Sequence, residues 1–153
     1  MPAELTPDRL AELAAGTLEE AAFVFTERAD PPPPFPGSVL EARLQYDGPS
    51  RGEIALRATP EFAAGLAANL LGSEPGDPET ARRSADALGE IVNMLAGAVV
   101  LELFGPVAQT RIGVPSVREC PGAAVPGGCL THLTTEEGER LDVCVRPRSG
   151  GPP

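Results

Sequence analysis

The sequence predicts an α+β domain, with two long helices packed on one face of a mainly antiparallel sheet. Two segments, 7–28 and 79–104, carry apolar residues at helical spacing, and the segments between and after them alternate as strands do. The chain has 153 residues, the usual size of one domain. We therefore expect a single domain over residues 7–147 and a disordered tail over residues 148–153.

The N-terminal part, residues 1–30, is expected to supply the first helix of the domain. Thr6 and Pro7 form a helix start, and apolar residues then recur at helical spacing to about Arg28. These apolar residues are Leu10, Leu13, Leu18, Ala21, Ala22 and Phe25. Residues 31–37 follow as a Pro-rich connector, which must be extended because proline lacks an amide donor and fixes φ. A docking site for a proline-reading partner is the alternative for this segment.

Residues 39–58 predict a β-hairpin, because two alternating segments flank the Asp-Gly-Pro turn at 47–49. Thr59 then offers an N-cap hydroxyl and is followed by a proline in the first helical turn. We expect a helix over Pro60–Leu71 that stops at Gly72.

The longest helical pattern runs from about Glu79 to Phe104 and ends at Gly105 and Pro106. Three later segments alternate as strands, namely 107–114, 129–133 and 141–145. A turn near residues 136–139 joins the last two of them. The Pro/Gly-rich segment 120–128 has no predicted element.

Charge and hydropathy exclude several classes of function. The net charge is −10 and all twelve positive charges are arginines, which argues against binding to a nucleic-acid backbone. No apolar run approaches the length of a bilayer crossing, and Met1 does not begin a secretory leader. We therefore expect a cytoplasmic protein without membrane contact.

Cysteine and histidine chemistry is also poorly supported. Cys120, Cys129 and Cys144 are odd in number and lack Cys-x-x-Cys spacing, so neither a disulfide framework nor a zinc site is indicated. His132 is the single histidine, which leaves nothing from which to build a multi-histidine metal site. A structural role is favoured for His132.

The long helix carries a polar stripe. Each helical residue advances about 100°, so Asp86, Glu90, Asn93 and Gly97 fall within an arc of roughly 60°. The opposite side is apolar and must face the sheet, through Leu88, Ile91, Val92, Leu95 and Val99. An outward polar stripe is most often only solvated surface. However, asparagine is a mediocre helix former, and its position one turn after a glutamate favours a functional use.

These residues resemble the signature of a known phosphatase family. The segment from Asp86 through Glu90 and Asn93 to Gly97, followed by Val-Pro-Ser-Val at 114–117, resembles that of the CheC, CheX and FliY phosphatases. The order of the other expected elements also resembles that family over most of the chain. One Glu-x-x-Asn pair, rather than two, makes the chain similar to CheX and unlike CheC. The resemblance implies a CheC-like fold.

The resemblance implies that the protein removes the aspartyl phosphate of a phosphorylated response regulator of the CheY type. Asn93 would orient a water in line with the phosphorus, and Glu90 would pair with the receiver's lysine. The receiver would supply Mg²⁺, and the phosphatase would need no cofactor of its own. Relatives of CheX form homodimers, so a homodimer is expected here.

Four further residues are expected at the partner-binding surface. Asp86 matches the first position of the family signature, and Gly97 would leave room for the partner, with packing inside the core as the equal alternative. Arg82 and Arg83 flank the stripe and would steer an acidic receiver, although solvated arginines are the more common case.

Two other functions stay open. One is a non-catalytic module that binds a receiver without hydrolysing its phosphate. The other, ranked last, is a structural component related to the flagellar switch proteins.

Overall fold

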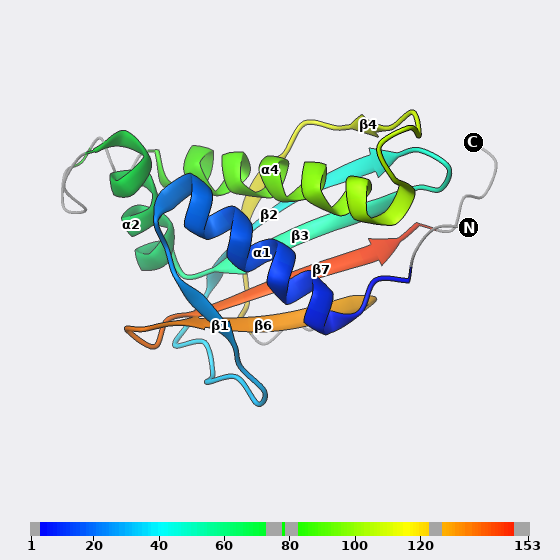
Figure 1. Cartoon of the computed structure of the whole chain (residues 1–153). Coiled ribbons are helices and arrows are strands. Elements are labelled where there is room, and N and C mark those ends of the chain that lie inside the picture. The colour runs from blue at the N-terminus through cyan, green and yellow to red at the C-terminus, as the bar shows by residue number, and fades with distance from the viewer. Residues whose placement is uncertain (1–3, 73–77, 79–82, 123–126, 149–153) are drawn as a thin grey trace.

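The computed structural model describes residues 4–72, 78, 83–122 and 127–148. In these residues three helices cover one face of an antiparallel sheet, as Figure 1 shows. The elements in chain order are α1 (Pro7–Ala22), β1 (Thr26–Arg28), β2 (Val39–Asp47), β3 (Gly52–Ala58), α2 (Pro60–Leu71), α4 (Ser84–Phe104), β4 (Arg111–Ile112), β5 (Ser116–Cys120), β6 (Cys129–Thr135) and β7 (Arg140–Pro147). The predicted fold class is confirmed.

The sheet has the strand order β1-β6-β7-β3-β2-β4, and β5 also pairs with β2. All of these pairs are antiparallel. The predicted hairpin forms its centre as β2 and β3, with Leu40 opposite Ala58 and Tyr46 opposite Gly52. A side chain at position 52 would overlap the Tyr46 ring, so glycine is required there.

The second helix has the predicted boundaries. The Thr59 hydroxyl accepts a hydrogen bond from the Phe62 amide at 3.1 Å, which satisfies one of the free donors of the first turn. Gly72 ends α2 in the left-handed conformation at φ 68°, where glycine carries no steric penalty. The predicted N-cap at Thr59 and the predicted helix end at Gly72 are both confirmed.

The first helix is shorter than predicted. It ends at Ala22, because Phe23 adopts a left-handed conformation at φ 56° and its amide donates to the carbonyl of Glu19. Residues 26–28, expected to be helical, instead form β1 and pair with β6. Strand pairing satisfies the backbone groups of these residues at the edge of the sheet, and it outweighs their local helical pattern. The prediction of a helix to about Arg28 was wrong.

The edge of the sheet beside β2 also differs from the prediction. Of the expected strand 107–114 only β4, residues 111–112, pairs with β2, and Val107 and Val114 are exposed. The Gly113 amide still donates to the Gln45 carbonyl at 2.8 Å, but Pro115 has no amide to continue the ladder. Pairing resumes with β5, an element that the sequence analysis missed.

The C-terminal end is paired further than expected. Strand β7 reaches Pro147, which pairs with Gly52, and the Arg148 amide donates to the Arg51 carbonyl at 3.0 Å. Residues 149–153 of the predicted tail lie outside the described residues, as do residues 79–82 of the predicted long helix.

Helix α4 lies at the centre of the core. Its apolar side is buried as predicted, with Leu88, Ile91, Val92, Leu95 and Val99 each at most 1% exposed. By length and composition this helix could also cross a membrane, contrary to our expectation from the sequence. Half of its most apolar stretch is buried inside the domain against α1, α2 and the sheet, so packing accounts for its apolar character.

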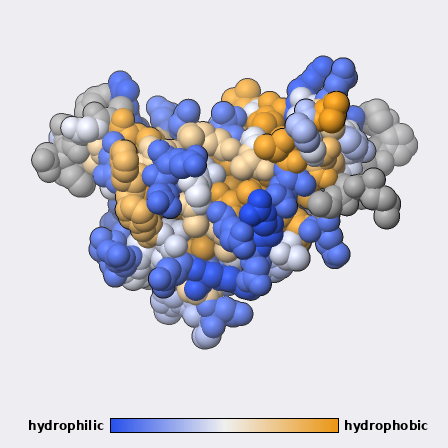
Figure 2. Space-filling model, in the orientation of Figure 1, coloured by the Kyte–Doolittle hydropathy of each residue, from blue (hydrophilic) through white to orange (hydrophobic). Residues whose placement is uncertain are grey.

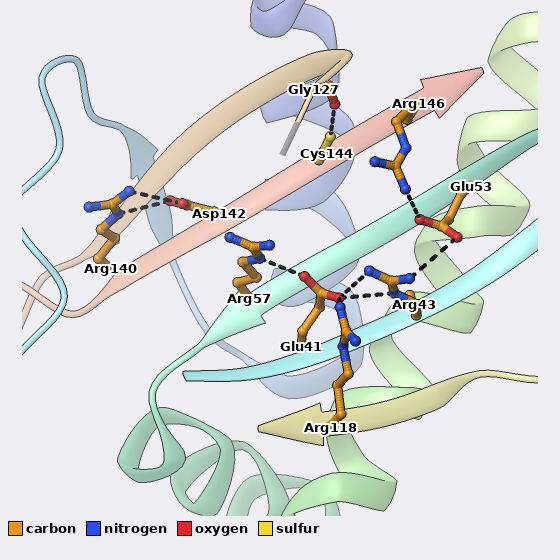
Figure 3. A network of polar contacts seen from close by, with 10 residues as sticks. All are labelled: Glu41, Arg43, Glu53, Arg57, Arg118, Gly127, Arg140, Asp142, Cys144 and Arg146. Atoms are coloured by element: carbon orange, nitrogen blue, oxygen red, sulfur yellow. Dashed lines mark hydrogen bonds and ion pairs between the residues drawn. The ribbon is translucent and has the colours of Figure 1, made fainter. Parts of the chain in front are cut away.

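The other face of the sheet carries a network of charged side chains, drawn in Figure 3. Glu41 is only 1% exposed and lies 2.7 Å from Arg57 and 2.6 Å from Arg43. Burial by itself raises the pKa of Glu41, but the hydrogen bonds from Arg57 and Arg43 outweigh it and hold that pKa below the usual range. This network makes the second face of the sheet polar, so the helices cover the apolar face.

Candidate functional site

The polar stripe of α4 faces outward from the domain. Asp86, Glu90 and Asn93 are exposed, while the residues between them in sequence are mostly buried. Because the apolar side of the same helix is held against the sheet, the backbone that carries Glu90 and Asn93 is rigid. The two side chains follow each other by one turn on a fixed support.

A groove runs along this stripe, and we call it the α4 groove. One wall is helical, formed by Ala85, Asp86, Gly89, Glu90 and Asn93. The other wall is the segment between β4 and β5 together with the start of β5, through Gly113, Val114, Pro115 and Val117. The groove therefore brings two segments of the predicted signature together in space.

The second wall exists because Pro115 interrupts the pairing of the edge strand with β2. Between β4 and β5 the chain leaves the ladder, and Val114 is 90% exposed beside α4. A Cβ atom built on Gly89 would lie 3.6 Å from the Pro115 ring, so the helix and this segment approach to ordinary contact distance. A proline at this position thus shapes the groove as well as ending the strand.

Neither of these two predicted site side chains is engaged by another residue that the structure describes. Within the described part of the chain, the side chains of Glu90 and Asn93 take part in no hydrogen bond and no ion pair. A carboxylate accepts hydrogen bonds only, whereas a carboxamide both donates and accepts them. Together they can bind a cation and orient a polar molecule such as water.

The other predicted site residues are placed as follows. Asp86 lines the α4 groove. Gly97 lies on the same stripe beyond the groove, and no atom outside its own helix lies within 4 Å of a Cβ built there. Arg83 is exposed and occupies the N-cap position of α4 without a capping hydrogen bond from its side chain, whereas Arg82 lies outside the described residues. The open space around Gly97 removes core packing as the reason for a glycine at this position.

Val114 and Gly113 were not singled out from the sequence as site residues, although Val114 belongs to the matched signature. The signal that could have found them is Pro115, because a proline in an edge strand interrupts the hydrogen bonds of the residues next to it. Their place beside α4 depends on the register of β4 and β5 against β2.

The remaining candidates for chemistry lie elsewhere. His132 Nδ1 is 2.7 Å from Asp142 Oδ1, and Arg140 binds the same carboxylate, so His132 belongs to a structural hydrogen-bonded cluster. The three cysteines are free. Among the residues that the structure describes, no group of three metal-ligating side chains converges. The α4 groove is therefore the best candidate site.

A family model described as chemotaxis phosphatase CheX matches residues 41–127, which is more than half of the chain. The matched region runs from β2 to the segment before β6 and includes both walls of the α4 groove. A sequence comparison with curated proteins gives no match.

Solved structures with the same fold cover nearly the whole chain. The chemotaxis protein CheX from Desulfovibrio desulfuricans is 20% identical, with a TM-score of 0.62 over 90% of this chain and 96% of that one. A chain of the CheX-CheY-BeF3-Mg²⁺ complex from Borrelia burgdorferi is 19% identical, with a TM-score of 0.67 over 92% and 96%. A CheC-like superfamily protein from Shewanella sp. PV-4 is 14% identical, with a TM-score of 0.61 over 91% and 96%. At these identities the likeness establishes the CheC-like fold.

Proposed function

The chain belongs to the chemotaxis phosphatase CheX family, and from that premise we propose that it removes the aspartyl phosphate of a phosphorylated CheY-type response regulator. The observation that carries this proposal is the pairing of Glu90 and Asn93 on the exposed side of α4, both unengaged among the described residues and both lining the α4 groove. A receiver domain is the proposed partner, and the Borrelia burgdorferi complex of CheX with CheY supports it.

The proposed chemistry divides the work between the two proteins. The receiver holds the acyl phosphate and Mg²⁺, which neutralise the charge that develops on the transferring group. What the phosphatase adds is a correctly placed nucleophile. Hydrolysis transfers the phosphoryl group from the aspartate to a water molecule, and it leaves a free carboxylate and inorganic phosphate.

Asn93 is the proposed water-positioning residue. Its carboxamide can accept a hydrogen bond from the water and donate one to a phosphoryl oxygen, which aligns the water without any change of protonation. The rigid support of α4 makes such alignment effective, because small displacements of a reacting atom lower rates steeply. Asn93 therefore affects turnover more than binding.

Glu90 is the proposed docking residue. One turn before Asn93, its carboxylate can pair with a lysine of the receiver and set the distance at which the amide enters the receiver's site. Truncating one partner of a buried, hydrogen-bonded charge pair at an interface costs about 2 to 5 kcal/mol of binding free energy. Glu90 therefore affects docking more than Asn93 does.

The decisive experiment compares wild type with Asn93→Ala. We expect phosphate release from a phosphorylated receiver to fall about 100-fold, while affinity for the BeF3 form of that receiver changes less than about threefold. Gln109→Ala is the matched control, because it removes an exposed amide outside the α4 groove. Equal phosphate release by wild type and Asn93→Ala would refute the catalytic role.

The alternative function is a module that binds the receiver without hydrolysis. It predicts tight binding of wild type to the BeF3 receiver with no acceleration of phosphate release. The same two measurements thus separate the enzyme from the binding module. The homodimer and the cytoplasmic location expected from the sequence stay predictions, the first to be tested by sedimentation and the second by fractionation of cells.

A further inference from the structure

A second groove lies away from Glu90 and Asn93, and we call it the Phe groove. It is formed by the residues that follow α1, by one side of α2 and by the turn between β6 and β7. The buried side chains of Phe62 and Leu66 form its floor. It shares no lining residue with the α4 groove, so the two surfaces can be occupied independently.

Two phenylalanines stand exposed at this groove. Phe23 is 78% exposed and Phe25 is 58% exposed, and an apolar patch over the end of α1 is visible in Figure 2. Phe23 also holds the left-handed conformation at φ 56° that ends α1, a position where glycine or asparagine is usual. Exposed phenyl rings add little to the stability of the domain, but they would contribute strongly to an interface that covered them.

The rim of the Phe groove is acidic. Glu136, Glu137 and Glu139 line it, and Glu61 at the start of α2 lies near enough to act on Glu139. Burial, and then the charges of Glu137 and Glu61, raise the pKa of Glu139. Among the residues that the structure describes, none of these four carboxylates forms an ion pair with an arginine. No arginine that the structure describes therefore pairs with the negative charge at this rim.

From the exposed phenyl rings and this negative charge, we propose that the Phe groove docks a basic segment of a partner protein that also presents apolar side chains. The apolar side chains would cover Phe23 and Phe25, and lysine or arginine side chains would face the rim. Nucleic acid and an anionic membrane are repelled by the same carboxylates. A metal ion has no site here, because no three ligating side chains converge in the described part of the chain.

A second copy of this chain is a poorer occupant than a basic partner. The chain has no lysine. Most of the arginines that the structure describes already pair with carboxylates of their own domain, either in the network on the far face of the sheet or along α1. Among the described residues, this pairing leaves few arginines that could complement the rim of another copy.

The test uses the full chain and a synthetic amphipathic peptide of lysine and leucine, followed by amide NMR shifts. We expect the shifts to concentrate at residues 23–25, along α2 and at residues 136–139. Phe23→Asn with Phe25→Ser should weaken the peptide's affinity about tenfold, and Glu136→Gln with Glu137→Gln should do so as well. Asparagine is chosen at position 23 because it accepts the left-handed conformation.

Three results would overturn the proposal. One is equal binding by a peptide with glutamate in place of lysine. Another is a loss of affinity in Val107→Ser that is as large as the loss in the phenylalanine variant. Val107 is 92% exposed but lies outside the Phe groove. The third is a wild-type dimer that the phenylalanine variant dissociates, which would make the groove a self-interface.

Phosphate release from the receiver should be unchanged in the phenylalanine variant, so this proposal and the proposed function can be refuted separately.

Discussion

Replacing Gly97 by alanine should make the protein more stable and less active. Gly97 lies in the middle of α4, where glycine is unfavourable because it loses the most conformational freedom on folding. It also lies on the stripe of Glu90 and Asn93, one turn beyond Asn93. The structure gives no reason within the domain for a glycine at this position.

The expected gain in stability follows from the space around Gly97. No atom outside the helix lies within 4 Å of an added Cβ, so the methyl group meets no obstacle. The gain is then the difference in helix propensity, about 1 kcal/mol, which raises the melting temperature by about 2 to 4 °C for a chain of this size.

The expected loss of activity comes from the docked receiver. A methyl group between α4 and the partner would lift the partner from the helix and move Asn93 away from its working position. A misplacement of about 1 Å can lower a rate by about 100-fold, so we expect a fall of at least about tenfold in phosphate release. Thermal unfolding and phosphate release from one phosphorylated receiver measure both effects.

Gly16→Ala in α1 is the matched control. Its added Cβ also has no neighbour within 4 Å, but it lies on another helix and outside the α4 groove. We expect the same gain in stability with unchanged phosphate release. Full activity in Gly97→Ala would refute the docking role of the stripe at this position, and a loss of stability would refute the open space that we infer around it.

Three further predictions concern other parts of the molecule. Glu41→Gln should lower the free energy of unfolding by about 3 to 5 kcal/mol, measured by urea denaturation, because it removes the buried carboxylate that pairs with both Arg57 and Arg43. Since the folded pKa of Glu41 is lowered, its stabilisation is complete above the unfolded pKa, about 4.3, and is lost as the pH falls through the folded pKa. Val114→Ser should weaken binding of the BeF3 receiver about threefold to tenfold without changing stability, whereas Val107→Ser should change neither. Cys144 should resist iodoacetamide at pH 8 until the protein unfolds, because burial raises the pKa of its thiol to about 11, and rapid labelling of the folded protein would contradict this.

Most helices and the central hairpin could be predicted because their signals are local. The caps at Thr59 and Gly72 are interactions between residues three or four positions apart, and the apolar side of α4 repeats within each turn. The stripe of Glu90 and Asn93 is part of the same periodic pattern. Its outward position follows from the burial of the opposite side.

The errors concern residues whose structure depends on a distant partner. Residues 26–28 continue a helical pattern but form β1, because strand β6, more than a hundred residues later, offers free backbone groups. The short β4 and the missed β5 depend likewise on the edge of β2. Burial of the charged network around Glu41 could not be predicted either, since its arginines come from three different strands.

Local sequence thus decides the pair itself, because a rigid helix places Glu90 and Asn93 one turn apart in any fold that keeps the helix. Tertiary structure decides that this pair lines a groove, because the second wall comes from a segment that reaches α4 only through the register of β4 and β5 against β2. Helical periodicity is a property of the backbone within one segment, whereas a groove requires two segments whose separation is set by packing and hydrogen bonds elsewhere.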